Sequence, residues 1–237
     1  MKTLILCGGK GTRAYPHTET VPKPLLEVAD VPVVRHVMEI YASQGFADFV
    51  LAAGYLAERI TQFAQRLPGD WTVDVVDTGV DTNTGARIEK CRGVLGTRFL
   101  ATYADGLGNV DLGALVRFHE AHDGSATMTT VPLPSPYGTI ELDNERRVKR
   151  FTEKPSLPDH DINAGFFVFD ERAFEHWGGD DLERHVLPAL GRAGELFAYR
   201  HEGFWKSLDT YKDALELTAL HEEGSPPWMT SATPPSS

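Results

Sequence analysis

The stretch LCGGKGTRAYPHTETVPKPLL, residues 6–26, follows a short apolar run at the start of the chain. It places three glycines close to two fixed positive charges, Arg13 and Lys23. Glycines after a strand let backbone N–H groups gather around an anion, because glycine accepts positive φ and close approach. Arginine and lysine add charge-assisted hydrogen bonds to the same anion. The stretch therefore predicts a strand that ends in a polyphosphate-binding loop.

Three other interpretations of this loop are weaker. The P-loop pattern fails because no Gly-Lys-Ser/Thr follows at the required spacing. Gly9, Gly11 and Ala14 partly match the dinucleotide fingerprint, but that motif needs a helix directly after the turn, and three prolines interrupt the following residues. A plain surface turn would not need so many glycines and cations together. The pattern that remains is G-G-x-G-T-R, followed by P-K-P at residues 22–24.

Strands and helices alternate in the first half of the chain. Apolar runs predict strands, and amphipathic segments with capping residues predict helices. After residue 125 extended segments follow one another without a long helix, which predicts strands in mixed orientation. The alternation indicates an α/β fold with a Rossmann-like, mainly parallel sheet flanked by helices. The predicted strands are 2–7, 48–54, 71–79 and 98–106, and the predicted helices are 31–45, 56–67, 180–194 and 209–224.

Composition limits the classes of function. The chain has 237 residues and a net charge of −11, which disfavours nucleic acid and anionic membranes as partners. The two cysteines, Cys7 and Cys91, have neither metal-site nor disulfide spacing. The apolar run at the N-terminus is too short for a signal peptide, so we expect a cytoplasmic protein. We expect a single domain over residues 1–224 and a disordered Pro/Ser-rich tail over residues 225–237.

The loop pattern resembles that of the sugar-1-phosphate nucleotidyltransferases, and the similarity continues in order along nearly the whole chain. Its motifs look most like the glucose-1-phosphate cytidylyltransferase branch. The resemblance implies a GT-A-like fold whose mixed strands form the sugar-binding part. The matching segments are VDTGVDTNTGARI (76–88), TYADGLGNVDL (102–112), FTEKP (151–155), INAGFFVF (162–169) and GFWKSLDT (203–210).

The resemblance implies an enzyme in which an oxygen of a sugar 1-phosphate attacks the α-phosphorus of an NTP and releases pyrophosphate. Asp105 and Asp209 would be the Mg²⁺ carboxylates, consistent with the preference of Mg²⁺ for one or two carboxylates plus phosphates. On their own, Asp105 could be a turn residue and Asp209 a helix N-cap. Arg13 would clamp the β- and γ-phosphates, and Lys23 would lie on the α-phosphate. Arg13, Lys23 and Asp105 are thus the expected catalytic residues.

The same resemblance implies two sets of binding residues. Without it, Thr82 and Gly85 would be read as a plain β-turn, and the Glu153-Lys154 pair as an ordinary strand-end turn. The expected nucleotide-binding residues are Leu6, Gly8, Gly9, Gly11, Thr12, Arg13, Lys23, Thr82, Gly85 and Asp105. The expected sugar-phosphate residues are Gly138, Glu153, Lys154, Asn163 and Trp205. His119 and His122 share a helix face and are expected to be exposed helix-end residues rather than metal ligands.

The base and the sugar remain open at this point. Similarity to one branch favours CTP. The alternatives are the same reaction with UTP, dTTP or GTP and a non-glucose sugar phosphate, or a nucleotide-sugar-binding homologue without catalysis. A nicotinamide-dependent dehydrogenase is a weaker third hypothesis. We expect a homo-oligomer, because relatives in this family are commonly oligomers.

Overall fold

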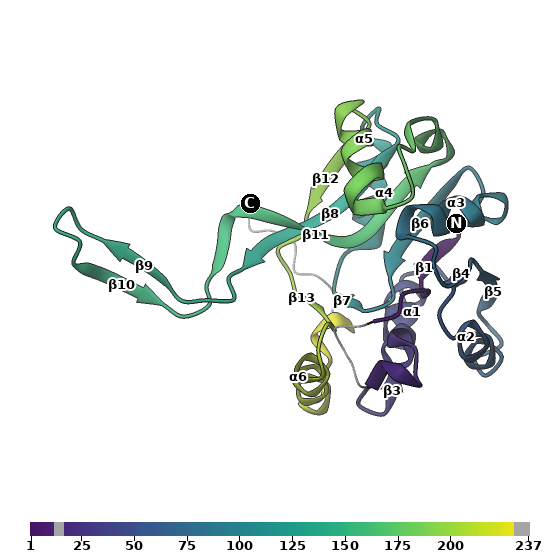
Figure 1. Cartoon of the computed structure of the whole chain (residues 1–237), viewed down its shortest axis with the longest axis horizontal. Helices are drawn as coiled ribbons and strands as arrows, with labels where there is room; N and C mark the ends of the chain where they lie inside the picture. The colour runs from purple at the N-terminus through teal and green to yellow at the C-terminus, as the bar shows by residue number, and fades with distance from the viewer. Residues whose placement is uncertain (12–16, 230–237) are drawn as a thin grey trace.

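A computed structural model describes residues 1–11 and 17–229 of the chain. Its centre is a seven-stranded sheet with the strand order β12-β8-β11-β6-β1-β4-β5 (Figure 1). Strand β11 runs antiparallel to its neighbours β6 and β8, whereas the other neighbouring pairs are parallel. The expectation of a mainly parallel sheet with added mixed strands is confirmed. The strands are β1 (Thr3–Leu6), β4 (Asp48–Ala53), β5 (Thr72–Asp77), β6 (Arg98–Tyr103), β8 (Ala126–Pro134), β11 (Ser156–Asp170) and β12 (Leu196–Arg200).

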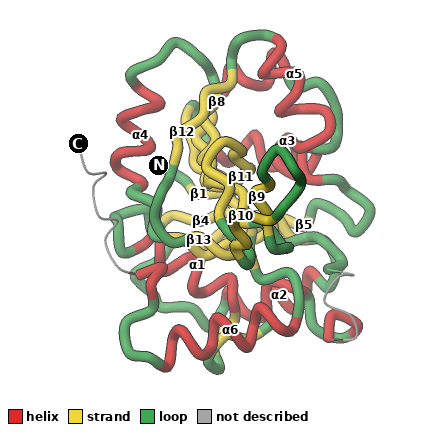
Figure 2. The backbone as a smooth tube through the Cα atoms, turned by 90° about the vertical axis from the view of Figure 1, so that its left-hand side faces the viewer, coloured by secondary structure: helices red, strands yellow, loops and turns green. Residues whose placement is uncertain are grey.

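Helices cover both faces of this sheet (Figure 2). Helices α1, α2, α4 and α6 pack on one face, and α3 and α5 pack on the other. Strand β1 supplies both cores because its side chains alternate: Ile5 enters the first cluster, and Leu4 and Leu6 enter the second. The helices are α1 (Val33–Ala42), α2 (Ala57–Ala64), α3 (Thr84–Leu95), α4 (Leu112–Glu120), α5 (Leu187–Arg192) and α6 (Tyr211–Glu222).

Three short antiparallel strand pairs complete the sheet structure. The pair β7–β13 lies beside the carboxyl end of β6, and the pair β2–β3 lies against α6. The hairpin β9–β10 projects from the body of the molecule as an arm (Figure 1). The bounds of these strands are β2 (Glu27–Val28), β3 (Val31–Pro32), β7 (Gly106–Gly108), β9 (Thr139–Leu142), β10 (Val148–Thr152) and β13 (Trp205–Ser207). The short helical turns are η2 (His17–Glu19), η3 (Lys23–Leu25), η4 (Glu171–His176), η5 (Leu182–Val186) and η6 (Pro227–Met229).

Two predicted helices differ from the observed ones. The helix expected over 31–45 begins at Val33, because Val31 and Pro32 pair with β2 as strand β3. The helix expected over 180–194 starts as a π-helical turn, η5, and becomes α-helical only at Leu187. Pro188, which lacks an N–H group, lies in the first turn of α5, directly after the π-helical turn.

Helix α3 was not predicted from the sequence. Its residues were read as part of a loop motif that continues to Ile88, and glycines at both ends of the segment hide the helical pattern. The apolar side chains of Ile88, Cys91 and Leu95 are spaced three and four residues apart and are all buried against the sheet. Both cysteines of the chain are free and buried, and burial raises the pKa of Cys91 to about 11.

The expectation for His119 was wrong. This side chain is 1% exposed and packs between α4 and β8. Its Nδ1 atom lies 2.9 Å from Thr127 Oγ1, and its Nε2 atom lies 3.3 Å from Asp170 Oδ1. His122 Nε2 lies 2.7 Å from the same threonine hydroxyl. Burial lowers the pKa of both imidazoles, although the Asp170 carboxylate opposes this shift.

The indole of Trp228 is buried, with 1% of its surface exposed. It makes edge-on contact with His36 and lies near Phe204 and His221. Trp228 belongs to the segment 225–237 that was expected to form a disordered tail, so at least its first part packs on the domain. Among residues 1–11 and 17–229, no helix is long and apolar enough to cross a membrane.

We predict that the free energy of unfolding falls as the pH drops through about 6.5, the pKa of histidine in an unfolded chain. Below this pH the unfolded state binds protons that buried His119 and His122 resist, so stability is lost on acidification. His119→Gln should reduce this loss between about pH 7.5 and 5.5, measured by urea unfolding. His176→Gln, at an exposed site, is the control. An identical pH slope in wild type and His119→Gln would contradict the assignment.

Candidate active site

Three charged side chains from distant parts of the sequence meet beyond the carboxyl end of β6. The Lys23 ammonium group donates one hydrogen bond to Asp105 Oδ2 and another, 3.0 Å long, to Asp209 Oδ1. The side chain of Lys23 is 11% exposed, and those of Asp105 and Asp209 are 22% and 31% exposed. The structure therefore brings together three residues that the sequence motifs singled out.

Backbone pairing and local hydrogen bonds hold the two aspartates side by side. Asp105 follows β6 and precedes β7, and the N–H of Leu208, after β13, donates to its carbonyl oxygen at 2.8 Å. Ser207 Oγ donates to Asp209 Oδ2 at 3.0 Å. Asp209 does not cap helix α6. Thr210 does so through a capping box with Asp213, which leaves the Asp209 carboxylate facing Lys23.

The glycine loop packs directly against Lys23. Gly11 has a φ of 61°, and a Cβ atom at this position would lie 2.7 Å from Lys23 Cβ. Any side chain here would be strained and would displace the lysine. A small cavity of about 70 Å³ lies beside it, lined by Gly9, Gly11, Lys23, Pro24, Ala104 and Asp105. Thr12 and Arg13, both expected to bind the nucleotide, lie outside the residues that the structure describes.

A second cavity, of about 210 Å³, shares Gly9 with the first. Of the expected base-side residues, Thr82 lines it and Gly85 does not. Gly85 packs under Asp180, whose carbonyl oxygen would lie 3.0 Å from a Cβ atom at position 85. The cavity is lined by Leu6, Gly8, Gly9, Thr82, Asn83, Thr84, Arg87, Asp181 and Glu183.

Arg87, which sequence reasoning missed, fixes the floor of this cavity. Its side chain is buried, and its guanidinium group donates to the carbonyl oxygens of Gly8 and Gly79 at 3.0 and 2.8 Å. Ala53, Thr78 and Val80 accept the other hydrogen bonds. Burial lowers the pKa of Arg87, and the negative charge of Asp77 opposes that shift. The guanidinium group thus ties the glycine loop to the ends of β4 and β5.

Two glycines make room for this arginine. A Cβ atom at Gly8 would lie 2.2 Å from Arg87 Nη1, and one at Gly54 would lie 2.3 Å from the same atom. The carbonyl of Gly8 also accepts the Tyr55 N–H at 3.0 Å, so both of its lone pairs are used. Gly8 is therefore required because any side chain there would collide with Arg87, whether or not its backbone also contacts a ligand.

The residues expected on the sugar side form two groups. Asn163 and Trp205 lie together: Trp205 Nε1 donates to the carbonyl of Ala164 at 2.8 Å, and Asn163 Oδ1 accepts the Gly165 N–H at 2.9 Å. The register of β11 shifts on both sides of Gly165, which has a φ of 78°. Bulges of this kind redirect side chains next to active sites, and this one sets the position of Asn163.

Gly138, Glu153 and Lys154 form the second group, in the segments that join the arm β9–β10 to strands β8 and β11. A Cβ atom at Gly138 would lie 2.4 Å from Phe151 and 3.0 Å from Glu153 Oε2, so this glycine permits close contact between the two segments. Glu153 and Lys154 are exposed, and Lys154 adopts a left-handed conformation with a φ of 44°.

A hydrogen-bonded chain of side chains joins the second cavity to Asn163. Asn163 Nδ2 donates to the Tyr103 hydroxyl at 3.1 Å, and Tyr103 donates to Glu183 Oε1. Glu183 Oε2 accepts the Thr84 hydroxyl at 2.9 Å. Sequence reasoning missed Tyr103 and Glu183. Tyr103 lies two residues before Asp105 and could have been noted, but nothing in the sequence places Glu183 near the glycine loop.

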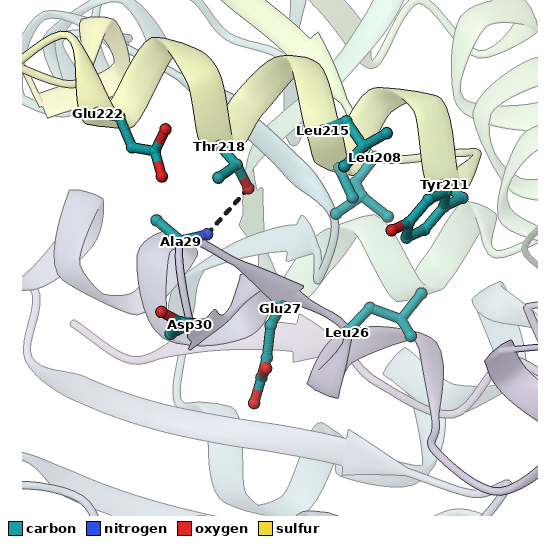
Figure 3. Close-up of a pocket in the computed structure, with 10 residues that line it drawn as sticks. Leu26, Glu27, Ala29, Asp30, Leu208, Tyr211, Leu215, Thr218 and Glu222 are labelled. Atoms are coloured by element: carbon teal, nitrogen blue, oxygen red, sulfur yellow. Dashed lines mark hydrogen bonds between the residues drawn. The ribbon is translucent and has the colours of Figure 1, made fainter.

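A cavity of about 370 Å³ lies elsewhere, between β2–β3 and α6 (Figure 3). Its lining combines apolar side chains such as Leu26 and Leu215 with the carboxylates of Glu27, Asp30 and Glu222. None of the expected substrate-binding residues that the structure describes lines it. Leu208 and Tyr211, which line it, are close to Asp209 in the sequence.

The donor atoms around Lys23 suit a hard divalent cation. Mg²⁺ is commonly held by one or two carboxylates together with substrate phosphates. Asp105 and Asp209 supply carboxylate oxygens that reach a common point, because one ammonium group bonds to both. Among residues 1–11 and 17–229, no cluster of three or more histidine, cysteine, aspartate or glutamate side chains could hold a metal ion. The two aspartates fit a Mg²⁺ site whose remaining ligands would include the substrate's phosphates.

Comparison with known proteins gives a consistent result. The family model described as nucleotidyl transferase matches residues 2–222. A protein of Bacillus subtilis named "Probable glucose-1-phosphate cytidylyltransferase" is 36% identical, over 96% of this chain and 99% of that protein. The glucose-1-phosphate cytidylyltransferase of Salmonella typhimurium is 33% identical, over 97% of this chain and 99% of its own length.

The fold is also found among solved structures. The crystal structure of HddC from Yersinia pseudotuberculosis superposes with a TM-score of 0.73 at 21% identity, covering 93% of this chain and 99% of HddC. At that identity the likeness supports the α/β architecture alone. Together with the sequence relatives, it confirms the resemblance on which the expected fold and reaction class depended.

We predict that Arg87→Met lowers the free energy of unfolding by about 3 kcal/mol, because several buried carbonyl groups lose their donor. Urea unfolding measures the change. Arg87→Lys should retain only a small part of the stability that Arg87→Met loses, since one ammonium group cannot reach the same acceptors. Arg92→Met, on the exposed side of the same helix, is the matched control and should cost less than about 1 kcal/mol. Equal effects at the two positions would contradict the anchoring role of Arg87.

Proposed function

The chain belongs to the nucleotidyl transferase family, and we propose that it transfers the cytidylyl group of CTP to glucose 1-phosphate. The observation that carries the proposal is the convergence of Lys23, Asp105 and Asp209 beside the glycine loop. CTP and glucose 1-phosphate are taken from the names of the two relatives that are similar over nearly their whole length.

The reaction is a displacement at phosphorus. An oxygen of the sugar phosphate forms a bond to the α-phosphorus, and the bond from that phosphorus to the oxygen bridging to the β-phosphate breaks, so that pyrophosphate leaves. The protein forms no covalent bond in this step. Its contribution is to position two polyanions and to neutralise the charge that develops on the phosphoryl oxygens.

Lys23 is suited to the α-phosphate. An ammonium group has three donors, and the two aspartates accept two of them. The third can bond to a phosphoryl oxygen in the adjoining cavity, which Lys23 lines together with Gly9 and Gly11. The ammonium group lies beside this cavity, so it can stabilise the negative charge that develops on the phosphoryl oxygens.

Asp105 and Asp209 would hold Mg²⁺. When bound, this ion would neutralise phosphate charge and orient the triphosphate. We assign the β- and γ-phosphates to Arg13. The sugar phosphate is assigned to Lys154, and the sugar hydroxyls to Glu153, Asn163 and Trp205.

Two alternatives differ in what they require of the site. The same reaction with UTP, dTTP or GTP needs only different partners for the base. A nucleotide-sugar-binding homologue without catalysis would not need Lys23 held between two carboxylates, and the retained arrangement argues against it. Product mass from a matrix of nucleotides and sugar 1-phosphates, with pyrophosphate release, separates these alternatives.

Two further properties are part of the proposal. We place the enzyme in the cytoplasm, where its nucleotide and sugar phosphate substrates are made. We also propose a homo-oligomer, which is favoured by exposed apolar side chains on the projecting arm, including Ile140, Val148 and Phe151.

Lys23→Ala is expected to lower kcat by about 10²–10³, as removal of one preorganised donor to a transition state does. Coupled pyrophosphate release under saturating substrates measures the effect. Lys212→Ala, an exposed lysine of helix α6, is the control and should leave kcat unchanged. An unchanged kcat in Lys23→Ala would remove this lysine from the reaction.

Asp105→Asn is expected to abolish turnover at Mg²⁺ concentrations that saturate the wild type, because an amide is a much poorer ligand for a hard cation than a carboxylate. Removal of Mg²⁺ with EDTA should stop the wild-type reaction, and added Mg²⁺ should restore it. The Mg²⁺ concentration for half-maximal rate is the quantity measured. Wild-type Mg²⁺ dependence in Asp105→Asn would show that the metal is held elsewhere.

A further inference from the structure

The cavity of about 210 Å³ lies across Gly9 from the cavity that Lys23 lines. Gly9 contributes to both, and a Cβ atom at this position would meet no other atom within 4 Å, so the backbone there is open to a ligand. A nucleotide whose phosphates lie against Gly9, Gly11 and Lys23 therefore directs its base into the 210 Å³ cavity. This placement rests on the proposed function.

Most polar side chains around that cavity already form hydrogen bonds within the protein. The Arg87 guanidinium group donates to four carbonyl oxygens and to the Thr78 hydroxyl. Thr82 donates its hydroxyl proton to the carbonyl of Thr78. Asn83 donates its amide to Asp180 Oδ2 at 2.8 Å. These groups fix the walls of the cavity and have few donors left for a base.

The carboxylates are different, because they are acceptors with spare capacity. Glu183 accepts the hydroxyls of Tyr103 and Thr84, one on each oxygen. An ionised carboxylate has about four lone-pair sites, so roughly two remain. Asp181 also lines the cavity, but its Oδ1 atom accepts the Arg184 N–H at 2.8 Å and caps the following helical turn. Glu183 differs from Asp181 in that a hydroxyl donor holds each of its two oxygens.

The two hydroxyls hold the Glu183 carboxylate in one orientation. Tyr103 and Thr84 come from different elements, the end of β6 and the start of α3, and they bond to different oxygens. Burial, reinforced by the Glu183 charge, raises the pKa of Tyr103, which keeps its phenol protonated as a donor. A carboxylate fixed in this way can discriminate between ligand groups that donate and groups that only accept.

The pyrimidine bases differ in this property at C4 and, in the opposite sense, at N3, so the carboxylate must face C4 to favour cytosine. Cytosine carries an amino group at C4, which donates hydrogen bonds, whereas uracil and thymine carry a carbonyl oxygen there, which only accepts. A glutamate or aspartate commonly accepts from the cytosine amino group, and its lone pairs repel a carbonyl oxygen. We propose that Glu183 is the residue that selects the nucleobase, favouring the amino-bearing cytosine of CTP over the keto pyrimidines of UTP and dTTP.

The test compares CTP with UTP on the same enzyme preparation, so that the fraction of folded protein cancels. For the wild type, kcat/KM should favour CTP by about 10- to 100-fold, the range that one specific hydrogen bond provides. Glu183→Gln can turn an amide donor toward a carbonyl oxygen and should reduce the preference to within about threefold. Tyr103→Phe, which frees the carboxylate to rotate, should give a preference between the two. Glu175→Gln, at an exposed glutamate of η4, should keep the wild-type ratio.

Calorimetric titration of CTP and UTP with Mg²⁺ gives a second measurement that does not depend on turnover. Tighter binding of CTP that is lost in Glu183→Gln supports the assignment, even if a different sugar phosphate is the substrate. Equal or greater wild-type affinity for UTP, or an unchanged CTP-to-UTP ratio in Glu183→Gln, overturns it. Failure of the wild type to form any nucleotide sugar, while CTP is still selected by Glu183, would contradict the proposed function and leave this inference standing.

Discussion

The site depends on one ionic contact: the Lys23 ammonium group held between the carboxylates of Asp105 and Asp209. These residues lie 82 and 186 positions from the lysine along the chain, and each is positioned by a different part of the fold. The central strand β6 delivers Asp105. The β7–β13 pair delivers Asp209 beside it, and the turn η3 between Pro22 and Leu26 delivers the lysine. A large part of the chain must fold before the three charges meet.

Removing one member of such a group does more than delete a contact. Two carboxylates left close together without the lysine repel each other, and a partly buried ammonium group without them loses its partners. The cluster is therefore a structural link, and its two carboxylates would hold the divalent cation that accompanies a polyphosphate. Arg87 has a comparable role on the other side of the glycine loop, where neutral carbonyl groups rather than carboxylates receive its hydrogen bonds. Lys23 lines the cavity of about 70 Å³ beside the loop, and Arg87 supports the cavity of about 210 Å³.

Much of this arrangement could be predicted from the sequence, because short-range signals encode it. The apolar run 2–7, the glycines after it and the Pro-Lys-Pro turn predicted a phosphate-binding loop at the end of a strand. The strand β6 and its following Asp105 were expected at the carboxyl edge of a parallel sheet, where open α/β sheets bind ligands. The alternation of strands and helices, and with it the parallel sheet, was predicted from the periodicity of apolar residues. That periodicity depends on residues close in sequence and not on distant contacts.

What could not be predicted depends on contacts between remote segments. His119 was expected to be an exposed residue at a helix end, but β8 and Asp170 cover it. Helix α3 was hidden by its glycines, of which Gly85 is explained by the close approach of Asp180. Glu183 reaches the cavity of about 210 Å³ because η5 packs on α3. No local pattern in the sequence around residues 180–186 indicates that this segment packs against α3.

A crystal structure with CTP and Mg²⁺ bound, in the absence of sugar phosphate, tests the central claim most directly. The account predicts a metal ion held by Asp105 and Asp209, the triphosphate along Gly9, Gly11 and Lys23, and the cytosine amino group within hydrogen-bonding distance of Glu183. Nucleotide bound in the large cavity beside α6, or bound with Lys23 and the two aspartates remote from its phosphates, would contradict it.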